Sequence, residues 1–443
     1  MPKDEVSRET IAAIASAPGR GGIGVVRVSG SKVAQVATAV TGSLPAPRHA
    51  TLCVFKDRSG RRIDEGIALY FAAPRSYTGE DVLELQGHGG PVVMQMLLAA
   101  CVEAGARLAE PGEFTQRAFL EGKLDLAQSE AVADLIDAAS REAARSALRS
   151  LSGEFSAAVH GLVARLTELR ALTEAMLDFP EEDLDSLHHD DASSRLARIR
   201  ADLDLLFTRS RQGSLLATGI QVVIAGAPNV GKSSLLNRLA GAERAIVTPI
   251  AGTTRDAVRE PIEIAGVPIM LIDTAGLRSS TDEIERIGMD RTRKELRGAD
   301  VVLAVFEAGE NHTLHEPLPR DAVRIDVYNK ADLMPRFRPP GGEYPALTVS
   351  AKTGAGLDVL KEAILRAAGW TSTGESVFLA RERHLHALER ARKHLGEAYG
   401  QQERWELFAE ELRLAQAALG EITGVTTADD LLGEIFGRFC IGK

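Results

Sequence analysis

The chain has 443 residues, of which 44% are hydrophobic and 26% charged, and its formal net charge at pH 7 is −10. This composition is typical of a folded globular protein, and it argues against a broad basic face for nucleic acid, although a local basic patch remains compatible with it. No apolar run approaches the roughly 18 residues of a membrane-spanning helix and the first residues are charged, so we expect a cytoplasmic protein without a membrane segment.

The pattern along the chain predicts several domains, as expected at this length. Residues 1–118 alternate short β-like runs with glycine-rich turns, which predicts a small α/β domain. From Thr115 to Phe179 apolar residues recur at three- and four-residue steps, which predicts a long helical stretch and assigns 119–215 to helices. The run DFPEEDLDSLHHDD interrupts these helices and is interpreted as a solvated turn.

The third part, residues 216–376, alternates β-rich runs with helices. This order predicts a doubly wound, mostly parallel sheet with helices on both faces. The helical pattern returns over 377–443. The predicted fold is therefore α/β and all-α multidomain, with an α/β domain inserted between two halves of a helical domain.

The inserted domain contains a phosphate-binding motif. GAPNVGKSS matches G-x-x-x-x-G-K-[ST] from Gly226 to Ser233, between an apolar strand and a helix. Gly226 and Gly231 allow the backbone to wrap a polyphosphate, Lys232 can reach the outer phosphates, and the Ser233 hydroxyl can ligate Mg²⁺.

Three further motifs predict guanine specificity. DTAG, Asp273 to Gly276, ends a strand and can hold the magnesium shell and sense the γ-phosphate. NKAD places Asp332 where its carboxylate can accept hydrogen bonds from N1–H and the exocyclic amine of guanine, and SAK, Ser350 to Lys352, closes the base pocket.

The water-positioning residue of Ras-like GTPases is missing, because Leu277 follows DTAG where those proteins carry glutamine. Asn229 in the phosphate loop can instead coordinate a monovalent cation, and TPIAGTTRD, Thr248 to Asp256, can complete that site with carbonyl oxygens. A bound K⁺ would offer a charge similar to that of an arginine finger, which contributes about 10³ to 10⁵ in rate.

Long motifs spread over essentially the whole chain resemble the MnmE (TrmE) family of tRNA-modification GTPases, in the TrmE-Era-EngA-like superfamily. They are GAPNVGKSSLLNRL, TPIAGTTRD, DTAGLR with DEIERIG, NKAD, PGRGGIGVVRVSG, YTGEDVLELQGHGG, EFTQRAFLEGKLDLAQSEA and FCIGK. The resemblance implies an N-terminal α/β tetrahydrofolate-binding-like and dimerisation domain, a helical domain and an inserted Ras-like P-loop G domain.

The resemblance also implies roles for residues of the G domain. K⁺ would be held by Asn229, Thr248, Ile250 and Thr253, and Mg²⁺ by Ser233 and Thr254. Glu285 would position or activate the attacking water. The implied GTP-binding residues are Asn229, Val230, Gly231, Lys232, Ser233, Ser234, Thr248, Pro249, Ile250, Ala251, Gly252, Thr253, Thr254, Asp273, Thr274, Ala275, Gly276, Asn329, Lys330, Asp332, Ser350, Ala351 and Lys352.

In the N-terminal domain, Arg27, Glu84, Lys123 and, from the chain end, Lys443 would contact a tetrahydrofolate derivative in its 5-formyl or methylene form. GTP and K⁺ would bring together the G domains of a homodimer. With the FAD-dependent partner MnmG, in a heterotetramer or larger complex, the family adds a (carboxymethyl)aminomethyl group at C5 of the wobble uridine of certain tRNAs, using the folate one-carbon unit.

Alternative readings stay open from the residues alone. An Era-type ribosome-assembly GTPase shares the nucleotide motifs but would carry a basic RNA-binding module after the G domain. A dimerising GTPase switch without one-carbon chemistry is the other alternative. GRGGIG, Gly19 to Gly24, fits the dinucleotide motif G-x-G-x-x-G, but a strand-like run follows where a helix should begin.

The three cysteines are Cys53, Cys101 and Cys440, which show no metal-binding spacing and are expected to be reduced thiols. The ending CIGK fails as a prenylation signal because of Gly442 and Lys443. Cys440 shares a helical face with Leu432, Ile435, Phe436 and Phe439. It is therefore either buried filler or, as the resemblance implies, a participant in the modification chemistry near the folate site.

Overall fold

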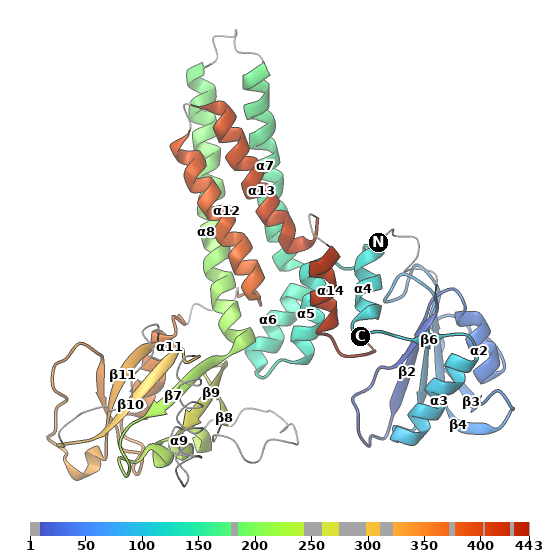
Figure 1. Cartoon of the computed structure of the whole chain (residues 1–443), viewed down its shortest axis with the longest axis horizontal. Coiled ribbons are helices and arrows are strands. Elements are labelled where there is room, and N and C mark those ends of the chain that lie inside the picture. Colours follow the sequence, from blue (N-terminus) through green and yellow to red (C-terminus); the bar gives the residue numbers. More distant parts are fainter. Residues whose placement is uncertain are drawn as a thin grey trace, which may run out of the picture. The chain divides into compact units, whose positions relative to one another are not determined.

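The structure is a computed structural model that describes residues 9–178, 185–242, 259–273, 298–310, 322–371, 377–401, 404–425 and 429–442. It contains two compact units, Met1–Ala133 with Gln416–Lys443 and Asp134–Ala415 (Figure 1). The predicted combination of α/β and all-α parts is confirmed, whereas the domain limits near residues 118, 215 and 376 stay predictions. No helix in the described residues is long and apolar enough to cross a membrane.

The first unit is built on a six-stranded sheet in the order β3-β4-β5-β2-β1-β6. Its strands are β1 (Ile11–Ile14), β2 (Gly24–Ser29), β3 (Thr51–Lys56), β4 (Arg62–Phe71), β5 (Val82–Gly87) and β6 (Arg107–Leu108). Neighbours pair antiparallel except β1 and β6, which are parallel. A strand, β2, follows the GRGGIG run, so the predicted mismatch with a dinucleotide-binding motif is confirmed.

Strand alternation gives this sheet two different faces. Its helices are α2 (Val33–Thr41), α3 (Pro91–Glu103) and α4 (Glu113–Leu120). Ala12 and Val28 belong to a core shared with α2 and α3, whereas Ile11 and Ala13 pack with Phe114 of α4 on the other side. Because side chains alternate along a strand, Arg27 of β2 points away from the α2 and α3 face, toward α4.

A buried ionic network fixes α4 against the sheet. Arg117 donates to Glu113 Oε1 at 2.8 Å and to Glu80 Oε2 at 2.9 Å, and Ser29 Oγ donates to the same Glu80 oxygen at 2.7 Å. Burial by itself raises the pKa of Glu113, but hydrogen bonds from Arg107, the Glu110 amide and Arg117 outweigh it and hold that pKa below its usual value. The carboxylate therefore stays charged, and removing either partner would strand a buried charge.

The chain end returns to this unit after α14 (Asp429–Gly437), whose side chains Ile435 and Phe436 are buried together with Phe439. Pro111 and Ile441 form an isolated antiparallel bridge. Gly442 has φ +98, and a Cβ there would lie 2.4 Å from the carbonyl oxygen of Ile14. The tail thus runs against the end of β1 along a path that requires glycine.

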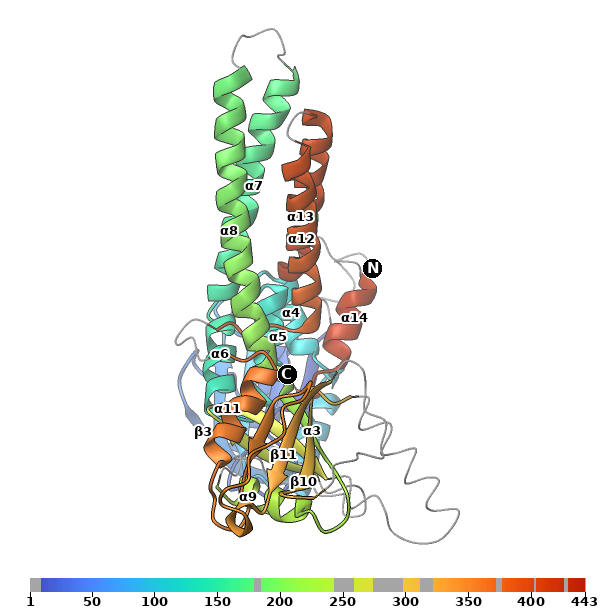
Figure 2. The ribbon, with the colours of Figure 1, turned by 90° about the vertical axis from the view of Figure 1, so that its left-hand side faces the viewer.

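Long helices dominate the second unit. They include α6 (Arg141–Leu151), α7 (Glu154–Asp178), α8 (Asp185–Thr218) and α12 (Glu382–Gly400), with α5 (Leu126–Ile136) and α13 (Trp405–Thr423) belonging partly to each unit. Figures 1 and 2 show α7, α8 and α12 running side by side.

The predicted helical stretch from Thr115 to Phe179 is helical where it is described, but it is divided into four helices, α4 to α7, by breaks that the sequence pattern did not predict. Ser140 caps α6 by accepting the Ala143 amide, and Gly153 with φ +89 ends the turn after α6. The interpretation of the whole acidic run as a turn is partly wrong, since residues 185–191 form the first turns of α8. Residues 179–184 lie outside the described residues.

A second six-stranded sheet has the order β12-β11-β10-β7-β9-β8 and is parallel except for the β8–β9 hairpin. Its elements are β7 (Ile220–Ala225), β8 (Arg259–Ile264), β9 (Val267–Asp273), β10 (Val301–Glu307), β11 (Val323–Asn329), β12 (Ala346–Thr348), α9 (Lys232–Ala242), the 3₁₀ helix η2 (Ala331–Leu333) and α11 (Leu357–Ala367). The predicted mostly parallel sheet is confirmed. In such sheets ligands bind at the carboxyl ends of the strands, where β7, β9 and β11 deliver the nucleotide motifs.

Candidate functional site

The phosphate loop joins the end of β7 to the start of α9 and depends on two glycines. Gly226 has φ +153, and a Cβ there would lie 2.3 Å from the Val305 carbonyl oxygen. Gly231 has φ +95, and a Cβ there would lie 2.3 Å from Asn329 Nδ2. Neither position admits a side chain, so the backbone approaches its neighbours closely and leaves the amino end of α9 free to face a polyphosphate.

Two side chains at the start of α9, Lys232 and Ser233, were predicted to bind phosphate and Mg²⁺. Lys232 is 7% exposed, and its Nζ donates to the carbonyl oxygens of Gly226 at 3.0 Å and Ala227 at 2.9 Å. Ser233 Oγ donates to Asp273 Oδ2 at 2.9 Å. A hydroxyl and a carboxylate at this separation suit a hard cation such as Mg²⁺.

Asn329 ties the base-recognition motifs to the phosphate loop. Its Nδ2 donates to the Val230 carbonyl at 3.0 Å, and its Oδ1 accepts the Ala351 amide at 3.0 Å. Ser350 Oγ donates to Asp332 Oδ1 at 2.6 Å. These hydrogen bonds connect the phosphate loop, NKAD and SAK. Ser350 orients the Asp332 carboxylate, whose other oxygen can accept a hydrogen bond from a base.

Four further residues that were predicted to bind the nucleotide are described in the structure. Asn229 is exposed at φ +68, and Lys330 adopts φ +62 while forming an ion pair with Glu307. Ser234 and Lys352 are exposed. The predicted residues 248–254, 274–276, Glu285 and Lys443 lie outside the described residues, so the full cation site and the water-positioning group stay predictions.

On the sheet of the first unit, Arg27 and Glu84 face each other in register from β2 and β5. Arg27 Nε donates to Glu84 Oε1 at 2.9 Å, and the two side chains are 22% and 19% exposed. The Arg27 guanidinium lies 5.4 Å from the Tyr77 ring centroid and 5.8 Å from that of Phe114. A planar cation, a carboxylate and two rings can bind a flat heterocycle with donor and acceptor edges.

The side chain of Lys123 is fixed against the loop that contains Tyr77, because Lys123 Nζ donates to the Pro74 carbonyl oxygen at 2.9 Å. The Tyr77 hydroxyl lies 2.8 Å from Thr115 Oγ1, and burial raises the pKa of Tyr77. Sequence reasoning gave Tyr77 and Phe114 no role, although both lie in motifs that carried the resemblance, YTGED and EFTQRAF.

Cys440 differs from the other two cysteines. Burial raises the pKa of Cys101 to about 12 and also raises that of Cys53, whereas Cys440 is exposed. It lies beyond the last residue of α14, so the interpretation as buried filler on a helical face is wrong, although Ile435, Phe436 and Phe439 are buried as predicted. An exposed thiol on a tail that the Pro111–Ile441 bridge holds in place is compatible with a part in the modification chemistry that the resemblance implies.

Comparisons with known proteins cover nearly the whole chain. A family model described as the MnmE helical domain matches residues 126–440, and one described as the N-terminus of GTP-binding protein TrmE matches residues 10–123. The protein called tRNA modification GTPase MnmE is 60% identical in Azoarcus sp. (strain BH72) and 59% identical in Thiobacillus denitrificans, with 98% of each chain covered. The G domain of the T. maritima FeoB iron transporter is 27% identical over 34% of this chain and 98% of that one, but its TM-score of 0.24 supports no argument.

Proposed function

The chain belongs to the MnmE (TrmE) family of tRNA modification GTPases, and from this membership we propose that it hydrolyses GTP in order to modify the wobble uridine of certain tRNAs. The proposal that the nucleotide is GTP is supported by hydrogen bonds that connect five residues, Val230, Asn329, Ala351, Ser350 and Asp332. This set joins a phosphate loop to a carboxylate that matches guanine, so GTP is the nucleotide that the site fits.

For hydrolysis, Ser233 and Asp273, joined by the predicted ligand Thr254, would hold Mg²⁺, and Lys232 would contact the outer phosphates. The exposed carboxamide of Asn229 would contribute to a K⁺ site completed by Thr248, Ile250 and Thr253. Such a cation supplies positive charge to the transferring phosphoryl group. Glu285 would position the attacking water in the absence of a glutamine after DTAG.

Replacing Na⁺ with K⁺ at constant ionic strength is expected to raise GTP turnover by about 10-fold or more, since a fixed charge at the phosphates contributes up to about 10³ to 10⁵. Asn229→Ala is expected to abolish this difference while leaving turnover in Na⁺ nearly unchanged. Phosphate release measured in both salts checks the result. Equal rates of GTP hydrolysis by the unmodified chain in the two salts would contradict a K⁺ site at the phosphates.

For the modification itself, we assign Arg27, Glu84, Lys123 and Lys443 to a tetrahydrofolate derivative, in its 5-formyl or methylene form. The Arg27–Glu84 pair with the rings of Tyr77 and Phe114 supports this assignment, because a pterin is flat and carries donors and acceptors along its edge. The chain would act in the cytoplasm as a homodimer, together with FAD-dependent MnmG and tRNA, and would add a (carboxymethyl)aminomethyl group at C5 of the uridine. Folate binding by the full chain separates this function from a dimerising switch without one-carbon chemistry.

Cys440→Ser is expected to leave GTP turnover within about twofold, because Cys440 is not one of the residues assigned to the nucleotide or its cations. Loss of tRNA modification in the same variant would assign the thiol to the modification chemistry. Both activities are measured in parallel, and Cys53→Ser is the matched control, since Cys53 is partly buried in β3. Normal modification by Cys440→Ser would contradict a chemical role for this thiol.

A further inference from the structure

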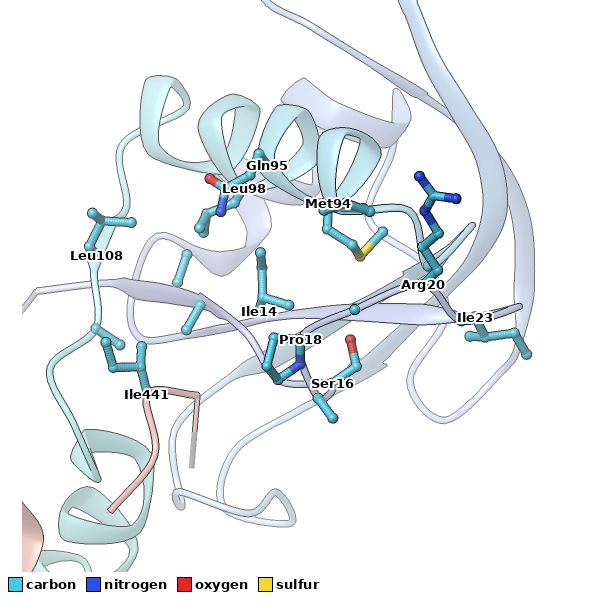
Figure 3. Close-up of a pocket in the computed structure, with 18 residues that line it drawn as sticks. Ile14, Ser16, Pro18, Arg20, Ile23, Met94, Gln95, Leu98, Leu108 and Ile441 are labelled. Carbon is cyan, nitrogen blue, oxygen red and sulfur yellow. The ribbon is translucent and has the colours of Figure 1, made fainter. Parts of the chain in front are cut away.

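A cavity of about 730 Å³ lies in the first unit, between α3, the loop that follows β1, and the chain end (Figure 3). Ile14 and Met94 point toward each other across it. Leu108 and Ile441 lie near one end and Arg20 lies at the other (Figure 3). Most of its walls are apolar, and its volume is within the range of about 300 to 1,000 Å³ that is common for small-molecule sites.

This cavity has a lining different from that of the Arg27–Glu84 site, since neither of those residues nor Lys123 lines it. The two sites are neighbours, because Ala13 and Ala109 line the cavity and also pack with Phe114, on which Arg27 stacks.

Glycine contacts fix the wall made by the loop after β1. The Gly21 amide donates to the Gly89 carbonyl at 3.1 Å. A Cβ on Gly89 would lie 2.7 Å from the Gly21 carbonyl oxygen and 2.8 Å from atoms of Ile23. The two segments are therefore in direct backbone contact, so the cavity is formed before any ligand arrives.

The charge of the lining is unusual for this acidic chain. Among the 18 lining residues Arg20 is cationic and none is acidic, although the chain has 62 acidic residues and 52 lysines and arginines. The side chains of Arg20 and Gln95 form no hydrogen bond or ion pair within the part of the chain that the structure describes. An apolar slot with an unpaired cation at one end and an unpaired carboxamide on α3 suits a ligand with a flat body, an amide-like edge and an anionic group.

We propose that this cavity receives the target uridine of the tRNA, with the base between the apolar walls near Gln95 and Ile441 and a flanking phosphate at Arg20. The assignment rests on the proposed function, which requires an unpaired pyrimidine to reach this unit. The Gln95 carboxamide offers both the acceptor and the donor that N3–H and O4 of uracil need. Unstacking costs least for a base that is already unpaired, as in an anticodon loop.

The position of the tail agrees with this assignment. Ile441 lines the cavity and is bridged to Pro111, and the exposed Cys440 precedes it directly in the chain. A uridine bound beside Ile441 would therefore lie near the thiol that the proposed function singles out. A purely apolar ligand would use neither Arg20 nor Gln95.

The test is photo-cross-linking of the full chain to a transcribed tRNA that carries a single 4-thiouridine at the wobble position. We expect cross-links in the peptides that contain Ile14 to Ile23, Pro91 to Leu98 or Ile441. Gln95→Glu keeps the side-chain shape but replaces the donor with a negative charge, so it should lower the yield of these cross-links about 5- to 100-fold, and Arg20→Ala should lower it as well. Met96→Ala is the matched control, because Met96 lies on α3, is 46% exposed and does not line the cavity.

Cross-links that map elsewhere, or yields unchanged in both Gln95→Glu and Arg20→Ala, would overturn the inference. If tRNA binding, GTP turnover and modification were normal in those variants, the assignment of the cavity to the uridine would be wrong and the proposed function would stand. If the full chain bound no tRNA at all, both would fall. A tRNA with 4-thiouridine in its acceptor stem should give no cross-link to these peptides, and equal labelling by that tRNA would also contradict the assignment.

Discussion

Asp332→Asn is expected to weaken GTP binding by about 10⁴-fold, because a site built to pair with a base rejects one that it cannot pair with by about that factor. Ser350 Oγ donates to Asp332 Oδ1 at 2.6 Å, so the asparagine would keep its oxygen toward Ser350 and turn its NH₂ group toward the base. The asparagine NH₂ group would face the N1–H and amine groups of guanine, which are also donors, so no hydrogen bond could form between them. It matches the carbonyl that xanthine carries in place of the amine, so affinity for xanthosine triphosphate should rise.

Fluorescence titration with both nucleotides measures this change. Asp326→Asn is the matched control, because Asp326 lies on β11, the strand that leads to η2 and Asp332, and pairs with Arg324, so its substitution makes the same change in charge outside the site. Unchanged GTP affinity in Asp332→Asn would mean that the carboxylate does not contact the base.

Lys232→Ala is expected to lower GTP turnover by about 10² to 10³-fold, the usual effect of removing one donor aimed at transition-state charge. The Lys232 ammonium group is buried within the loop, where the Gly226 and Ala227 carbonyls hold it ready for the outer phosphates. K⁺ should not restore the rate, because Lys232 is not among its predicted ligands, which are Asn229 and residues of the segment 248–253.

Single-turnover phosphate release measures this effect, and an unchanged thermal unfolding profile excludes a folding defect. Lys361→Ala, on α11 of the same unit, removes the same charge away from the site and should leave turnover unchanged. Turnover within twofold of normal in Lys232→Ala would contradict the assignment of the phosphate loop.

The nucleotide site could be predicted from sequence because its chemistry lies in short runs between a strand and a helix. Gly226, Gly231, Lys232 and Ser233 lie within eight residues of each other along one loop, where local geometry decides their positions. The alternation of β-rich runs with helices over 216–376 also predicted the mostly parallel sheet, since parallel strands need helical crossovers between them.

The N-terminal site could not be derived in the same way. Arg27 and Glu84 are 57 residues apart, and only the antiparallel register of β2 and β5 brings them together. Their pairing depends on strand order, which no local pattern contains, so they were reached through resemblance alone. The stacking of Tyr77 and Phe114 on Arg27 depends in addition on the buried ions that fix α4.

Helix breaks were the other weakness of the sequence reasoning. The caps at Ser140 and Gly153 divide a region whose apolar periodicity is almost continuous. Cys440 has the spacing of a buried helical residue, but α14 ends at Gly437, so the periodicity no longer determines which way its side chain points.

The proposed modification of the wobble uridine is tested most directly by mass spectrometry of wobble nucleosides in tRNA from cells that lack this chain. We expect the aminomethyl-type group at C5 of the wobble uridine to disappear, to return with the unmodified chain, and to stay absent with Lys232→Ala. A full complement of modified wobble uridine in cells lacking the chain would contradict the central claim.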